Sequence, residues 1–214
     1  MDPRVLRIKT PDDMLAILKG EGRPLSTFHA GDTIHVWNKM RKGYSYKLQE
    51  EPGQGLDSAL KVYADPGTML SLGAFEGKYL NDCVLEFPAE WFLHAIALDK
   101  LRPTDPTVDV NFFKADSRQP LSEWKRKGWV PGARSTSTIL SDTAKNPDER
   151  GWFQWYCRYW MGRRLPELDA VQIARWRAFS RHAGQIRANC KPGDLTCRPR
   201  QRQALLQWSW NPFI

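Results

Sequence analysis

The chain has 214 residues, of which 41% are hydrophobic and 26% are charged, so it is long and apolar enough to fold around a substantial core. Its N-terminus lacks the apolar stretch of a secretory signal, and no segment approaches the roughly 18 apolar residues of a membrane span. We therefore expect a cytoplasmic or nuclear protein without membrane association, whose four cysteines are reduced.

The N-terminal half predicts one helix and a β-hairpin. Thr10 and Pro11 precede two acidic residues and an apolar run, which is typical of a helix that starts at Pro11 and ends at Gly20. Residues 32–37 and 44–48 alternate apolar and polar side chains and predict the two strands of the hairpin. A third short strand is expected at 107–113.

Later segments predict mainly helices. Proline favours the first turn of a helix, so we expect helices to begin at Pro88, Pro120 and Pro147. Residues 151–164 carry aromatic side chains on every side of a predicted helix, which indicates that this helix is buried. Residues 168–189 repeat apolar side chains at helical spacing, and a last helix follows Arg198.

These elements predict an α+β fold, in which a small N-terminal part that contains the β-hairpin packs on a mainly helical C-terminal subdomain. We expect a neutral α+β part at residues 1–130 and a Ser/Thr-rich connection at residues 131–147. A basic, aromatic-rich helical part follows at residues 148–214. One compact unit is preferred over two independent domains.

The positive charge is concentrated at the end of the chain. Residues 1–150 contain 21 Lys and Arg and 21 Asp and Glu, whereas residues 151–214 contain 11 and 3 and supply the whole net charge of +8. Nearly all of these 11 cations are arginine, which contacts phosphate in a planar, bidentate manner and stacks on rings. The expected partner is therefore DNA or RNA.

Arginine and glutamine side chains near the C-terminus form the candidate interface. Arginines on an exposed helix face suit phosphate, while Gln201 or Gln203 would approach base edges, because Arg and Gln pair with guanine and adenine. Trp155, Trp160 or Trp208 would stack on bases if exposed. The predicted nucleic-acid-binding residues are Arg163, Arg164, Arg177, Arg181, Arg198, Arg200, Gln201 and Arg202.

Two other functions stay open on the sequence. A small enzyme that acts on an anionic substrate would use Asp82 or Glu86, beside Tyr79, as a general acid or base. A protein-interaction module would present the basic face to an acidic partner. The sequence contains no P-loop, dinucleotide-binding, α/β-hydrolase or zinc-deaminase motif, which disfavours those chemistries.

A metal hypothesis rests on Cys157, His182, Cys190 and Cys197, which are ligand types that zinc binds tetrahedrally. The last two cysteines are separated by six residues, which is not a standard zinc-knuckle spacing. A disulfide between Cys190 and Cys197 is a second possibility, and plain buried thiols are the preferred one. No cofactor is therefore expected, and Cys83 is expected in the core.

Several long motifs occur in the last two-thirds of the chain: GKYLNDC at 77–83, EFPAEWF at 86–92, GWFQWYCRYW at 151–160 and CRPRQRQALLQW at 197–208. On these motifs the chain resembles a family of uncharacterised proteins from fungi, algae and other microbial eukaryotes. No activity is established for that family, so the resemblance implies no catalytic residues. It implies a nucleocytoplasmic, disulfide-free setting.

Overall fold

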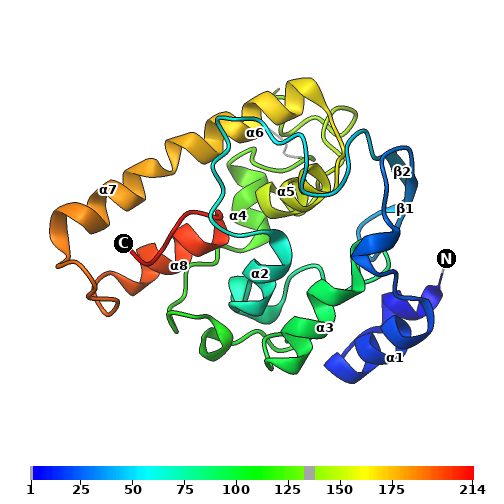
Figure 1. Ribbon diagram of the computed structural model, residues 1–214, viewed down its shortest axis with the longest axis horizontal. Helices are drawn as coiled ribbons and strands as arrows, with labels where there is room; N and C mark the ends of the chain where they lie inside the picture. The colour runs from blue at the N-terminus through cyan, green and yellow to red at the C-terminus, as the bar shows by residue number, and fades with distance from the viewer. Residues whose placement is uncertain (1, 133–137) are drawn as a thin grey trace.

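The computed structural model describes residues 2–132 and 138–214 and has an α+β fold (Figure 1). The α-helices are α1 (Pro11–Glu21), α2 (Pro66–Ser71), α3 (Ala89–Ala97), α4 (Leu121–Arg126), α5 (Trp152–Trp160), α6 (Pro166–Ala178), α7 (Ser180–Asn189) and α8 (Pro199–Gln207). Short 3-10 turns cover Pro3–Arg7, Leu25–Thr27, Ala74–Gly77 and Val108–Val110. In Figure 1, α6 and α7 run one after the other along one side, α8 lies beneath them, and α1 lies at the opposite end.

The predicted hairpin is confirmed. Strands β1 (Thr33–Trp37) and β2 (Lys42–Lys47) pair antiparallel, with Thr33 opposite Lys47. The strand expected at 107–113 is wrong, because the Thr107 side chain accepts a hydrogen bond from the amide of Asp109 and closes a 3-10 turn there. In the described part of the chain the hairpin is the only β-sheet.

The predicted helix starts are confirmed near Pro11, Pro88 and Pro120, where α1, α3 and α4 begin. Helix α1 continues one residue beyond the expected end at Gly20. The helix expected at Pro147 instead begins at Trp152, because Gly151 directly before it has a φ of +78°, which is not helical. Part of the predicted Ser/Thr-rich connection, residues 133–137, lies outside the described residues.

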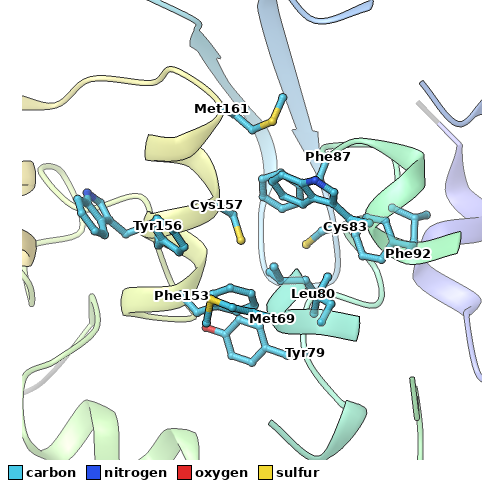
Figure 2. Packing of buried hydrophobic residues seen from close by; sticks show 14 of the residues in the cluster. Met69, Tyr79, Leu80, Cys83, Phe87, Phe92, Phe153, Tyr156, Cys157 and Met161 are labelled. Atoms are coloured by element: carbon cyan, nitrogen blue, oxygen red, sulfur yellow. The ribbon is translucent and has the colours of Figure 1, made fainter. Parts of the chain in front are cut away.

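Helix α5 is buried as predicted, and it is the centre of the core. Trp155, Tyr156 and Cys157 are fully inaccessible to solvent. Figure 2 shows Tyr156 and Cys157 of α5 within the same packed cluster as Cys83. This cluster contains buried residues from Val5 to Trp176, so both the neutral and the basic parts of the chain contribute to one core.

A buried ion network ties α5 to two distant segments. Arg158 donates to Glu86 at 2.6 Å and to Asp148 at 2.7 Å, and Arg163 donates to the same Asp148 at 2.6 Å. All four side chains are at most 3% exposed. Two guanidinium groups and two carboxylates make the network electrically neutral, which is the condition under which buried charge is tolerated.

The ionisation of Asp148 depends on its partners. Burial by itself raises the pKa of this carboxyl, but the guanidinium groups of Arg163 and Arg158 outweigh burial and hold the pKa below its ordinary value. The network therefore stabilises the fold when Asp148 is ionised.

A disulfide and a buried arginine organise the loop between α7 and α8. Cys190 and Cys197 are joined, so the preferred expectation of reduced, buried thiols is wrong for these two residues. Cys83 and Cys157 are free and buried. Arg202 is fully buried and donates to the backbone carbonyls of Cys197 and Asp194.

Replacing Asp148 tests the network. We expect Asp148→Asn to lower the free energy of unfolding by about 3–5 kcal/mol, because it leaves Arg158 and Arg163 buried with too little negative charge. Chemical denaturation checks this. Asp116→Asn is the control, since that carboxylate lies in an exposed pair with Arg200 and should matter little. Equal stability of the two variants would contradict the assigned role.

The same network predicts a pH dependence. Because the folded-state pKa of Asp148 is depressed, its stabilisation is complete above the unfolded-state value of about 4 and is lost as the pH falls through the lower folded-state pKa. Thermal melting between pH 6 and pH 2 should therefore show a loss of stability below about pH 4. The Asp148→Asn variant should show a shallower loss over that window.

Reduction tests the disulfide. Closing a loop of this size stabilises a fold by about 2–3 kcal/mol, so a Cys190→Ser/Cys197→Ser variant should unfold at a lower denaturant concentration. Alkylation of unfolded protein without reductant should label Cys83 and Cys157 alone. Labelling of all four cysteines without reductant would show that the bond does not form.

Candidate functional site

A pocket of about 360 Å³ lies between α4, α5, the α6–α7 pair and α8. Its apolar wall consists of Phe75, Trp124, Trp129, Trp152, Phe153, Phe179 and Trp208. Its cationic and polar wall includes Arg118, Gln119, Arg175, Arg181, His182 and Gln207. We call this hollow the aromatic–arginine pocket. Its volume is at the lower end of the range for small-molecule sites.

Three of its rings, from α5, the end of α8 and the junction of α6 and α7, form a stacked series, and a fourth ring is tilted against the last of them. Trp152 stacks on Trp208 with ring centroids 4.8 Å apart, and Trp208 stacks on Phe179 at 4.7 Å. The His182 ring lies 4.3 Å from Phe179. Because each ring is held by its neighbours, this side of the pocket is fixed before any ligand arrives.

Trp124 forms the wall contributed by α4. Its ring packs against the backbone of Gly151. A side chain at position 151 would place its Cβ atom 3.3 Å from the Trp124 ring. Gly151 also has a φ of +78°, which favours glycine. No contact of the Trp124 indole with another aromatic ring is found in residues 2–132 and 138–214. Trp124 packs partly against the core and lines the pocket with the rest of its indole, which can contact a ligand.

Arg175 is a half-buried cation of this pocket. Its guanidinium lies 5.3 Å from the centre of the Trp208 ring and 5.8 Å from that of Trp129. It donates to Gln172 at 2.8 Å, and it has no carboxylate partner among the described residues. Burial lowers the pKa of Arg175 to about 10, so it remains charged at neutral pH. A bound anion would offset the cost of burying this charge.

Three buried polar atoms of the lining residues have no hydrogen-bond partner. They are Nε1 of Trp152, Nδ1 of His182 and Nε2 of Gln207. Partial burial, together with nearby Arg181, lowers the pKa of His182, which favours its neutral form. Buried polar groups are normally paired, so a lining with three unpaired atoms is suited to a polar ligand or to water.

A second, more open hollow continues from this pocket. It is lined by Asp116, Ser117, Arg118, Gln119, His182, Arg200, Gln201 and Ala204, and we call it the basic cleft. The two hollows share five lining residues: Ser117, Arg118, Gln119, His182 and Ala204. A ligand longer than the pocket can therefore continue past Arg200 and Gln201.

The structure brings together three of the predicted nucleic-acid-binding residues. Arg181 lines the aromatic–arginine pocket, while Arg200 and Gln201 line the basic cleft. Arg177 is exposed but borders a different hollow, beside Trp176 and Trp210. Arg198 is half-buried at the start of α8 and lines neither hollow.

The remaining predicted arginines have their guanidinium groups engaged within the protein. Arg163 is buried against Asp148, and Arg202 is buried against backbone carbonyls. Arg164 donates to the carbonyls of Gln54 and Gly55. A guanidinium is as well suited to neutralising an internal carboxylate or capping carbonyls as to binding phosphate, and the sequence does not separate these uses.

The predicted stacking residues divide in the same way. Trp155 is fully buried and donates to Asp169 at 2.8 Å, so it does not meet the condition of being exposed. Trp160 packs on Trp91 in the core. Only Trp208 of the three lies in the aromatic–arginine pocket. Gln203 is also buried, where it accepts from the amide of Phe113.

The sequence patterns did not mark Arg175, Arg118, Trp124 or Trp129 as site residues. They marked His182 only as a candidate metal ligand. One pattern in the sequence does indicate the helix face that enters the pocket. Arg175, Phe179 and His182 follow one another at helical spacing, four and then three residues apart. The helix face that was predicted to contact phosphate, which carries Arg177 and Arg181, lies beside it. Trp124 and Trp129 come from a distant segment, so no local pattern marks them.

The residues of the enzyme hypothesis do not form an acid–base group. Asp82 accepts from Arg150 at 2.6 Å and 2.8 Å, and Tyr79 donates to the carbonyl of Arg150. Burial raises the pKa of Asp82, but Arg150 outweighs it and the net pKa is lowered, while burial raises the pKa of Tyr79. Glu86 is engaged by Arg158. These groups are therefore held in ion pairs or hydrogen bonds, not free for proton transfer.

The four residues of the zinc hypothesis are not available as a set. Cys190 and Cys197 are joined to each other, and Cys157 is buried in the core, where burial raises the pKa of its thiol. In the described ranges, no group of three or more His, Cys, Asp or Glu side chains is placed to hold a metal ion.

Within the part of the chain that the structure describes, no helix combines the length and apolarity needed to cross a membrane. Comparisons with protein-family models, with curated proteins and with solved structures find no match to this chain. The resemblance to uncharacterised proteins of microbial eukaryotes therefore stays a prediction.

Proposed function

We propose that this protein binds nucleic acid through the continuous surface of the aromatic–arginine pocket and the basic cleft. The observation that supports this most is the combination of Arg175 and Arg181, neither of which has a carboxylate partner among the described residues, with a wall of aromatic rings. Arginine beside aromatic rings suits a polyanion that also carries flat bases.

Internal neutralisation removes only part of the C-terminal charge. Carboxylates from residues 1–150 pair with Arg158 and Arg163 inside the protein. Arg200 pairs with Asp116 at 3.4 Å, but both side chains are more than half exposed, so that pair is weak and easily exchanged for a phosphate. Among the described residues after 150, the arginines that neither pair with a carboxylate nor donate to backbone carbonyls lie on α6, α7 and at the start of α8: Arg175, Arg177, Arg181, Arg187 and Arg198.

The alternatives have less support. An enzyme acting on an anionic substrate would need a free acid or base, and Asp82 and Glu86 are paired with arginines. A module for an acidic protein would need the basic face but not the aromatic lining. Binding that depends on both features distinguishes nucleic acid from an acidic protein.

Charge reversal tests the proposal. The Arg181→Glu/Arg200→Glu variant should bind mixed-sequence DNA and RNA more weakly, and its affinity should depend less steeply on salt, by about one unit of log–log slope for each lost phosphate contact. Fluorescence anisotropy at two salt concentrations measures both quantities. Arg7→Glu/Lys19→Glu is the matched control, with the same charge change at exposed positions near and on α1.

Thermal melting should show that both double variants remain folded, because all four positions are exposed. No detectable binding of any nucleic acid by the unmodified protein at low salt would overturn the proposal. Equal weakening by the control would show that net charge alone, and not this surface, is responsible.

A further inference from the structure

We infer that the aromatic–arginine pocket holds one unpaired nucleobase together with its phosphate, which makes the surface selective for single strands over duplexes. This inference rests on the proposed function and deepens it. A free nucleotide offers the same chemistry as one unit of a strand, namely a flat heterocycle joined to a phosphate. The experiment therefore compares a strand with a free nucleotide.

The walls suit a flat ring. The stacked rings of Trp152, Trp208 and Phe179 form a rigid side, and the Trp124 indole is free of ring partners among the described residues. Bases in a duplex are already stacked on both faces, whereas an unpaired base offers its faces to aromatic side chains. The pocket lining therefore favours an unpaired base over a base that is stacked within a duplex.

The unpaired polar atoms belong to lining residues but are themselves covered from solvent, so they would meet the edge of a base after small side-chain shifts. Nε1 of Trp152 and Nε2 of Gln207 are donors on side chains that are at least 95% buried. Nδ1 of His182 is a third atom without a partner. Nucleobase edges carry carbonyl oxygens, ring nitrogens and amino groups that complement such atoms, whereas a purely apolar ligand would leave them unpaired.

The cations suit the phosphate. Arg175 is half-buried without a carboxylate, Arg181 is exposed and also lacks one, and Arg118 has a partly exposed partner in Glu76 at 3.3 Å. One phosphate near Arg175 would supply the missing negative charge, and the next phosphates of a strand would continue along the basic cleft toward Arg200.

The test compares a single-stranded 12-mer with a hairpin duplex of the same composition, and adenosine 5′-monophosphate with adenosine and inorganic phosphate. We expect the single strand to bind at least about 10-fold more tightly than the duplex. Trp124→Ala should weaken single-strand binding by about 10-fold and leave duplex binding unchanged, while Trp124→Phe should restore most of the loss.

One control and one further site variant separate binding from folding. Trp37→Ala removes a half-buried tryptophan that also has a cation over its ring, Lys42 at 5.3 Å, but lies on the hairpin and should not alter binding. Arg175→Gln should remove the preference for the monophosphate over adenosine. Its melting temperature should not fall, because the variant eliminates a half-buried charge that has no carboxylate partner.

The outcomes are distinguishable. Equal binding of single strand and duplex, with no effect of Trp124→Ala but weakening by Arg181→Glu/Arg200→Glu, would overturn this inference and leave the proposed function intact. If the protein binds the monophosphate tightly but does not bind the 12-mer, its ligand is a free nucleotide and not a nucleic-acid strand. That result would overturn both this inference and the proposed function. If poly-glutamate displaces the 12-mer equally well from the unmodified protein and from the Trp124→Ala variant, the partner is an acidic protein. That result would overturn this inference and the proposed function.

Discussion

The neutral ion network of Glu86, Arg158, Asp148 and Arg163 is the interaction on which the rest of the molecule depends. It joins the buried helix α5 to a loop and to a segment 72 residues earlier in the chain. It also lies under the hairpin, since the Arg158 guanidinium is 5.3 Å from the Tyr44 ring. Each charge is tolerated inside only because the others are present, so the network holds these segments in a single arrangement.

That arrangement decides how the C-terminal arginines are used. Because α5 lies in the centre of the core, Arg158 and Arg163 face internal carboxylates, while on α6 and α7 Arg177, Arg181 and Arg187 are exposed and Arg175 is half-buried in the pocket. Arg202 and the Cys190–Cys197 disulfide hold the turn before α8, which presents Arg200 and Gln201 toward the segment at 116–119. The same residue type thus serves as an internal counter-ion, a carbonyl cap and a surface cation.

Local patterns predicted most of the elements but only part of the site, since Arg181 of the predicted face lines the pocket and Arg177 does not. The hairpin and the burial of α5 follow from side-chain periodicity, which is set by neighbours in the sequence. The 107–113 segment alternates like a strand, yet a side-chain hydrogen bond from within the segment turns it into a 3-10 helix. On α6 and α7, the face that enters the pocket carries Arg175, Phe179 and His182, and only the packing of α8 and α4 against it distinguishes it from the adjoining basic face.

The amino-acid sequence by itself determined the α+β class, the buried aromatic helix and the excess of positive charge in residues 151–214, because periodicity is local and formal charge is additive. Only the tertiary structure decided which arginines keep that charge at the surface. Ion pairing and burial depend on which groups approach within a few ångströms, and the carboxylates that neutralise Arg158 come from residues 10 and 72 positions away. The pocket likewise exists only where α4 closes against α5, α6, α7 and α8.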